Sequence, residues 1–73
     1  MKLVLYSTSH CHLCEQAEAL LAQLGVEAEH IDIVDDDALL ERYGTCIPVV
    51  KRADNGSEIG WPFDIASLRS FIA

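Results

Sequence analysis

Residues 9–24 read SHCHLCEQAEALLAQL and give the clearest indication of the fold. Cys11 and Cys14 stand where a polar loop passes into a pattern of apolar residues at helical spacing, which runs from Leu13 to Leu24. Polar side chains fill most positions off that stripe, and Gly25 follows at the place of a C-terminal cap. The stretch therefore predicts one amphipathic helix that carries a cysteine pair at its start.

The position of the pair predicts different roles for its two sulfurs. A sulfur at a helix N-terminus faces unpaired backbone N–H groups and the positive end of the helix dipole, and both favour thiolate over thiol. Cys11 is therefore the candidate nucleophile. Cys14 lies one turn further along, nearer the apolar stripe, and is the candidate resolving thiol that attacks a mixed disulfide on Cys11.

The residues on either side of this stretch predict a strand, helix, strand, helix order for the first half of the chain. Residues 2–6 are mostly apolar or aromatic and suit a buried strand that leads into the cysteine loop. Residues 26–34 contain a polar and apolar alternation and predict a second strand. Aspartates at 35–37 suit the start of a short helix that ends at Gly44. A helical connection makes the two strands parallel.

The second half predicts an antiparallel hairpin and a last helix. Residues 47–51 and 57–59 flank the turn sequence Asp54-Asn55-Gly56. Pro62 and Asp64 then begin a helix. Its inner side carries Ile65, Leu68, Phe71 and Ile72. The chain therefore predicts an α/β fold in the order β-α-β-α-β-β-α, a four-stranded mixed sheet with flanking helices.

Length and charge restrict the classes of partner. A chain of 73 residues is shorter than most domains, so we expect residues 1–73 to form a single domain. The formal net charge of −7 repels phosphate backbones and anionic membranes, so we expect no nucleic-acid and no membrane partner. No apolar run approaches the roughly 20 residues of a membrane helix, and the first residues do not suit a signal peptide. An odd count of three cysteines argues against a disulfide-stapled extracellular scaffold. Without a membrane helix or a signal peptide we expect a cytoplasmic protein, and we expect it to be a monomer.

Several short motifs resemble the glutaredoxin family of the thioredoxin fold across nearly the whole chain. They are Leu5-Tyr6-Ser7 before the cysteine pair, Ile47-Pro48 before a strand, and Ile59-Gly60 with Asp64 before the last helix. Cys-His-Leu-Cys and Trp61-Pro62-Phe63-Asp64 resemble a small bacterial branch called glutaredoxin-like. The resemblance implies a thiol-disulfide oxidoreductase that acts by mixed-disulfide exchange on protein or glutathione disulfides. It implies no tightly bound cofactor, with glutathione as a candidate co-substrate.

The resemblance also implies which residues bind substrate. Pro48 is then a cis-proline opposite the cysteine pair, and the backbone of Ile47 pairs with the substrate chain. Gly60 and Trp61 stand where many glutaredoxins have a glycine pair, so the Trp61 ring either narrows the groove, stacks on the substrate or packs into the core. Asp64 is either a helix cap alone or also a contact for the glutamyl end of glutathione.

Other interpretations remain open from the residues alone. The chain is alternatively a metal or iron-sulfur binding module, or a non-catalytic docking module, on the same fold. Cys11, Cys14, His12 and either His10 or Cys46 form a conceivable zinc site, but a second pair at ligand spacing is missing, so we predict no metal site. We favour Cys46 as a packed small apolar residue over a third redox thiol, and we expect the His12 side chain to point to water.

Overall fold

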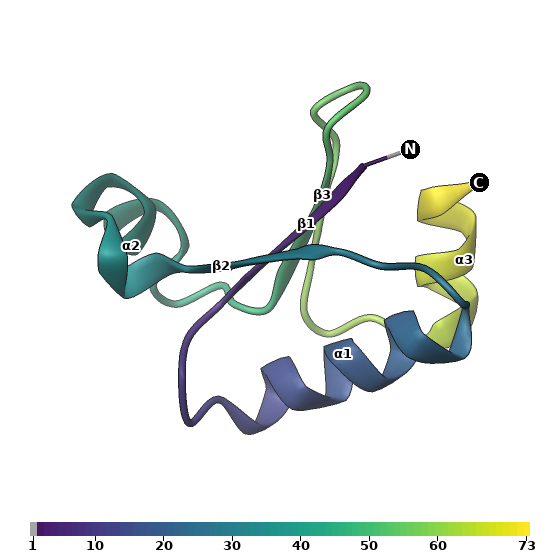
Figure 1. Cartoon of the computed structure of the whole chain (residues 1–73), viewed down its shortest axis with the longest axis horizontal. Helices are drawn as coiled ribbons and strands as arrows, with labels where there is room; N and C mark the ends of the chain where they lie inside the picture. The colour runs from purple at the N-terminus through teal and green to yellow at the C-terminus, as the bar shows by residue number, and fades with distance from the viewer. Residues whose placement is uncertain (1) are drawn as a thin grey trace.

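One mixed sheet organises the chain (Figure 1). Its strands lie in the order β2-β1-β3-β4. The computed structural model describes residues 2–73. Strand β1 pairs in parallel with β2, while β3 is antiparallel to both β1 and β4. The elements are β1 (Leu3–Ser7), α1 (His12–Gln23), β2 (Glu29–Asp32), the 3₁₀ helix η1 (Ile33–Asp35), α2 (Asp37–Tyr43), β3 (Val49–Arg52), β4 (Glu58–Gly60) and α3 (Ile65–Ile72). The predicted α/β order is confirmed.

The second strand is shorter than the predicted range 26–34. Its start is delayed because the backbone N–H of Val26 still donates to the carbonyl of Leu21, at 3.2 Å, in the turn that ends α1. Its end is set by Asp32, whose side chain accepts the backbone N–H of Val34 at 3.0 Å and so caps the helix η1. A side chain that bonds its own backbone two residues on competes with further strand pairing.

Short-range capping bonds begin the two later helices. The Asp36 side chain accepts the backbone N–H groups of Ala38 and Leu39 at 2.9 and 3.3 Å and begins α2. The Asp64 side chain accepts that of Ser67 at 2.7 Å and begins α3. Helix α1 is followed by Gly25 at φ 69°, a left-handed conformation that glycine adopts without steric cost.

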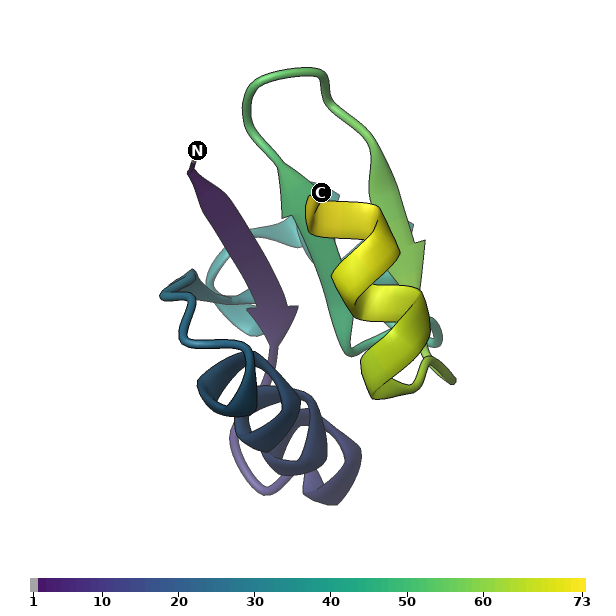
Figure 2. The same ribbon diagram turned by 90° about the vertical axis from the view of Figure 1, so that its right-hand side faces the viewer.

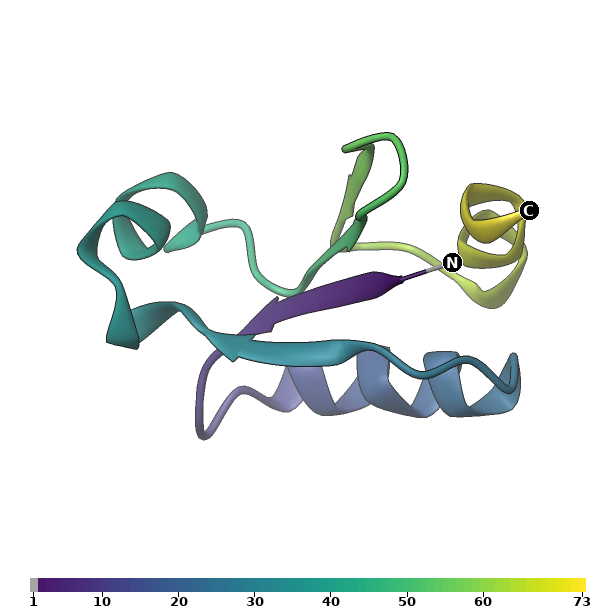
Figure 3. The same cartoon turned by 45° about the horizontal axis from the view of Figure 1, so that its top comes forward.

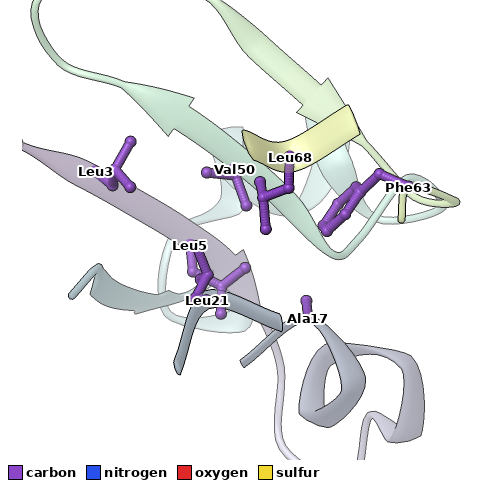
Figure 4. Packing of buried hydrophobic residues seen from close by; sticks show 7 residues of the cluster. All are labelled: Leu3, Leu5, Ala17, Leu21, Val50, Phe63 and Leu68. Atoms are coloured by element: carbon purple, nitrogen blue, oxygen red, sulfur yellow. The ribbon is translucent and has the colours of Figure 1, made fainter. Parts of the chain in front are cut away.

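Alternation along β1 divides the core into two clusters, one on each face of the sheet. Leu3 and Leu5 face α1 and α3, which lie on the same side (Figure 2). Figure 4 shows this cluster, whose buried members are Leu3, Leu5, Ala17, Leu21, Val50, Phe63 and Leu68. Tyr6 faces the other way and packs with Ile33, Tyr43 and Val49 beneath η1 and α2. Each helical layer thus buries its apolar side against one face of the sheet.

The two ends of the molecule along its long axis hold different elements. Helix α2 and the loop into α1 lie at one end, while the start of β1 and the end of α3 lie at the other (Figures 1 and 3). Within residues 2–73, none of the helices has the length and apolar character that a membrane crossing requires.

Candidate functional site

The cysteine pair lies at the junction between β1 and α1. Strand β1 ends at Ser7, and a short loop delivers Cys11 to the N-cap position of α1. Cys11 and Cys14 are joined by a disulfide, with their Cα atoms 5.2 Å apart. The predicted helix start at the cysteine pair is therefore confirmed.

His10 shapes the turn before the pair. Its φ of 59° lies in the left-handed region, where histidine is found more often than most residues other than glycine, asparagine and aspartate. The His10 side chain is exposed and the turn leads directly into the N-cap. The residue pattern placed His10 only in a conceivable zinc site, and no sequence motif marked the left-handed turn that it forms.

The two sulfurs have different hydrogen bonding and burial at the start of α1. The backbone N–H of Cys14 donates to Sγ of Cys11 at 3.1 Å, and the N–H of Glu15 donates to the carbonyl of Cys11 at 3.2 Å. Cys11 is half-buried, whereas only 3% of Cys14 is exposed. One sulfur therefore faces solvent and a helix N–H donor, and the other is covered by the core.

Two polar side chains on the first turn of α1, His12 and Glu15, point into solvent. The side chains of His12 and Glu15 are 83% and 72% exposed, and His12 Nδ1 lies 3.6 Å from Glu15 Oε2. An exposed pair of this kind contributes little to stability. The expectation that His12 points to water is confirmed.

The loop before β3 and the end of β4 reach the same edge of the sheet as the cysteine loop. In the strand register Tyr6 lies opposite Val49, and Val49 lies opposite Gly60. The Ile47-Pro48 peptide is cis, as the resemblance implied, and the Trp61-Pro62 peptide is cis as well. No sequence pattern predicted the second cis bond, because few X-Pro bonds are cis and the residues alone do not mark which.

Trp61 contributes to the core as well as to this edge. Its ring is half-buried, packs against the cluster around Leu5 and Leu68, and meets Phe63 edge-on with the ring centroids 5.1 Å apart. The interpretation of Trp61 as a packing residue is thus supported. A contact of the ring with substrate stays a prediction.

Asp64 is a helix cap. Its carboxylate accepts the backbone N–H of Ser67, and this hydrogen bond lowers the pKa of Asp64 below its ordinary value. The side chain is exposed. The capping interpretation is therefore confirmed, and a further contact with glutathione stays a prediction.

Cys46 is exposed, so the preference for a packed apolar residue was wrong. The backbone N–H of Cys46 donates to the carbonyl of Tyr43 at 2.8 Å in the turn after α2, and this turn holds the thiol at the surface. Cys46 lines an open cavity of about 350 Å³. The other lining residues are Arg42, Tyr43, Val49, Glu58 and Gly60.

A polar cluster beside this cavity was missed by sequence analysis. The Tyr43 hydroxyl donates to Glu58 Oε2, and Arg42 Nη2 lies 3.6 Å from Glu58 Oε1. Burial, the hydrogen bond to Glu58 and its negative charge raise the pKa of Tyr43 to about 12. Tyr43 also stacks on Tyr6 at 4.5 Å between ring centroids. Fifteen residues separate Tyr43 from Glu58, so no local pattern signals the contact.

The described residues 2–73 contain no arrangement of three or more His, Cys, Asp or Glu side chains that suits a metal ion. The zinc site considered from the sequence needs four such ligands around Cys11 and Cys14. Its conceivable members are therefore not brought together in this structure.

Comparisons with known proteins extend the resemblance over the whole chain. Residues 2–73 match the family model of the Glutaredoxin-like domain (DUF836). The X-ray structure of protein XcR50 from X. campestris is 41% identical with a TM-score of 0.89, and the match covers 96% of this chain and 93% of that one. The solution structure of Ne2328 from Nitrosomonas europaea is 29% identical with a TM-score of 0.82, covering 96% and 88%. No curated protein matches the chain. The chain belongs to the glutaredoxin-like family of the thioredoxin fold.

Proposed function

We propose that this protein is a thiol-disulfide oxidoreductase in which Cys11 and Cys14 act by mixed-disulfide exchange. The observation that carries the proposal is the backbone N–H of Cys14 directed at Sγ of Cys11, at the N-terminus of α1. When the pair is reduced, this donor and the helix dipole stabilise negative charge on Cys11. The family supports a redox function in general terms.

The first step forms a mixed disulfide. The Cys11 thiolate attacks one sulfur of a substrate disulfide, a bond forms between Cys11 and that sulfur, and the other substrate sulfur leaves as a thiolate that takes up a proton from solvent. Cys11 is suited to this attack because it is the more accessible sulfur of the pair.

The second step returns the pair to the disulfide. Cys14 loses its proton and attacks Sγ of Cys11, which releases the second substrate thiol and leaves Cys11 joined to Cys14. The substrate gains two electrons from the protein pair, and its two sulfurs gain two protons, one taken from solvent in the first step and one that balances the proton lost by Cys14. Burial of Cys14 favours this internal attack over reaction with outside disulfides. A thiol reductant must then reduce the pair before another cycle.

The substrate chain in this proposal lies along Ile47 and Pro48, next to Gly60, Trp61 and Asp64. A hydrogen bond joins two of these residues directly, because the Trp61 N–H donates to the carbonyl of Pro48 at 3.1 Å. Substrates are protein disulfides or glutathione mixed disulfides, without a tightly bound cofactor. We propose that the protein acts as a cytoplasmic monomer.

The test uses three variants that share Cys46→Ser, so that the exposed third thiol does not react. Each is reduced with dithiothreitol, freed of it, and mixed with a peptide disulfide. The Cys46→Ser protein should reduce the peptide and become a disulfide. Adding Cys14→Ser should stop the reaction at a covalent adduct on Cys11, visible by mass spectrometry with one released thiol per adduct. Adding Cys11→Ser should leave the peptide intact. Equal adduct formation in the last two variants would contradict the assignment.

A further inference from the structure

The segments around the cysteine pair meet at one edge of the sheet, here named the dithiol edge. Strands β1 and β2 run in parallel, with Ser7 opposite Asp32 at their last residues. The loop into Cys11 and the η1–α2 segment therefore leave the sheet at the same edge, and both lie at one end of the molecule (Figures 1 and 3). A polypeptide that reaches Cys11 must approach these segments.

Carboxylates dominate the dithiol edge. Glu15 lies in the first turn of α1. The others stand on the segment after β2, at Asp32, Asp35, Asp36 and Asp37. Apart from the half-buried Asp32, all of these side chains are exposed. Their combined field favours a cationic partner.

The positive charges lie mainly at the opposite end. Lys2 precedes β1 and pairs with Glu29 at 3.5 Å. Lys51 and Arg52 lie opposite the first half of β1. Arg52 pairs with the Asp54 carboxylate at 2.7 Å and bonds the carbonyls of Phe71 and Ala73 at the end of α3.

Among the remaining Lys and Arg residues, Arg69 lies in the last turn of α3, which ends beside Arg52. Arg42 is the exception in position, because it belongs to α2, but its guanidinium lies 3.6 Å from the Glu58 carboxylate. The charge of the chain is therefore polarised along the strand direction.

Apolar exposure is concentrated at the same edge. Single exposed apolar residues are common and carry no meaning. Among the described residues, however, the exposed large apolar side chains are Leu13, Val34 and Leu40, at 41%, 52% and 43%, and they stand on α1, η1 and α2. Leu13 lies between the two cysteines in the sequence. A substrate side chain that contacts Leu13 therefore belongs to a residue close to the substrate cysteine that meets Cys11.

We infer that the substrate sulfur belongs to a positively charged polypeptide segment with an apolar side chain beside its cysteine, and not to glutathione. This inference rests on the proposed function and specifies its substrate class. Lysine or arginine side chains meet the carboxylates of the dithiol edge, while the apolar side chain covers Leu13. Glutathione carries a net negative charge, so the same carboxylates repel it. Charge complementarity of this kind acts mainly on the rate of association and is screened by salt.

The test compares three disulfides in a single turnover with the reduced protein. Two are peptides of equal length with leucine beside the disulfide-bonded cysteine, one flanked by lysines and one by glutamates, and the third is glutathione disulfide. At low salt the lysine peptide should be reduced at least about tenfold faster than the other two, and the difference should shrink strongly in 0.5 M NaCl.

Matched charge reversals locate the effect. Asp35→Lys changes the dithiol edge, while Glu27→Lys makes the same change before the start of β2, at the far end. The first should slow reduction of the lysine peptide several-fold and the second should not. Equal rates for the three disulfides, or faster reduction of glutathione disulfide, would overturn the inference while leaving the proposed function standing. Failure to reduce any of them would remove both.

Discussion

The carbonyl oxygen of Pro48 accepts a hydrogen bond from the backbone N–H of Trp61 at 3.1 Å. This bond joins the loop before β3 to the end of β4, beyond the last strand pair between Val49 and Gly60. It fixes the backbone of the predicted substrate edge and leaves the Trp61 ring to pack against the core cluster and Phe63. The backbone of Trp61 therefore holds the predicted substrate edge, while its ring contributes to the packing of the core.

Replacement of the Trp61 ring should lower stability. Trp61→Gly removes a half-buried ring and its edge-on contact with Phe63, and we expect the free energy of unfolding to fall by about 2 kcal/mol. Trp61→Phe keeps an aromatic contact and should lose less than half of that. Urea unfolding followed by circular dichroism measures both. Unchanged stability in Trp61→Gly would show that the ring does not contribute to the core.

The three thiols of the reduced protein should react with iodoacetamide in a fixed order. Cys11 faces the Cys14 N–H and should be modified first, roughly tenfold faster than Cys46 near neutral pH, because the thiolate is the reactive form. Cys46 is exposed and follows, and the buried Cys14 comes last. Mass spectrometry of peptides after brief treatment gives the order. Faster modification of Cys46 or Cys14 would contradict the assignment of Cys11 as nucleophile.

The left-handed backbone at His10 predicts a dependence on side-chain shape. His10→Val places a β-branched residue at φ 59° and should cost about 1 to 2 kcal/mol of stability. His10→Asn is the matched control, because asparagine tolerates this conformation, and its stability should stay close to that of the parent. Because the His10 side chain is exposed, a difference in stability between the two variants cannot come from lost packing. Equal unfolding midpoints for the two variants would contradict this account.

The Tyr43 hydroxyl predicts a loss of stability in alkali. Its pKa is about 12 in the folded chain against an ordinary value of about 10, so the folded state holds this proton more tightly than the unfolded state. The contribution is fully present below pH 10 and is lost as the pH rises through about 12, with a slope of at most ~1.4 kcal/mol per pH unit.

Two variants isolate the Tyr43 contribution. Tyr43→Phe should lack this part of the slope, and Glu58→Gln should reduce it, because both the hydrogen bond to Glu58 and its charge raise the pKa. Urea unfolding at several values of pH between 9 and 12 gives the slopes. Identical slopes in the parent and Tyr43→Phe would show that Tyr43 does not titrate differently on folding.

Local sequence patterns were enough to predict the features that depend on near neighbours along the chain. Helix α1 begins at the cysteine pair and the later helices begin at Asp36 and Asp64, because capping bonds span only two or three residues. The order of strands and helices follows from periodicity in the same way, and with it the placement of Cys11 and Cys14 at one sheet edge.

Features that depend on distant neighbours could not be predicted from local patterns and became visible in the three-dimensional structure. The pKa of Tyr43 depends on a carboxylate fifteen residues away on β4. At the end of β2, a local capping bond from Val34 to Asp32 competes with strand pairing to the distant residue Ser7, and the sequence does not show which of the two prevails. The polarised charge arises because parallel strands gather segments from separate parts of the sequence at one edge, which no local pattern records.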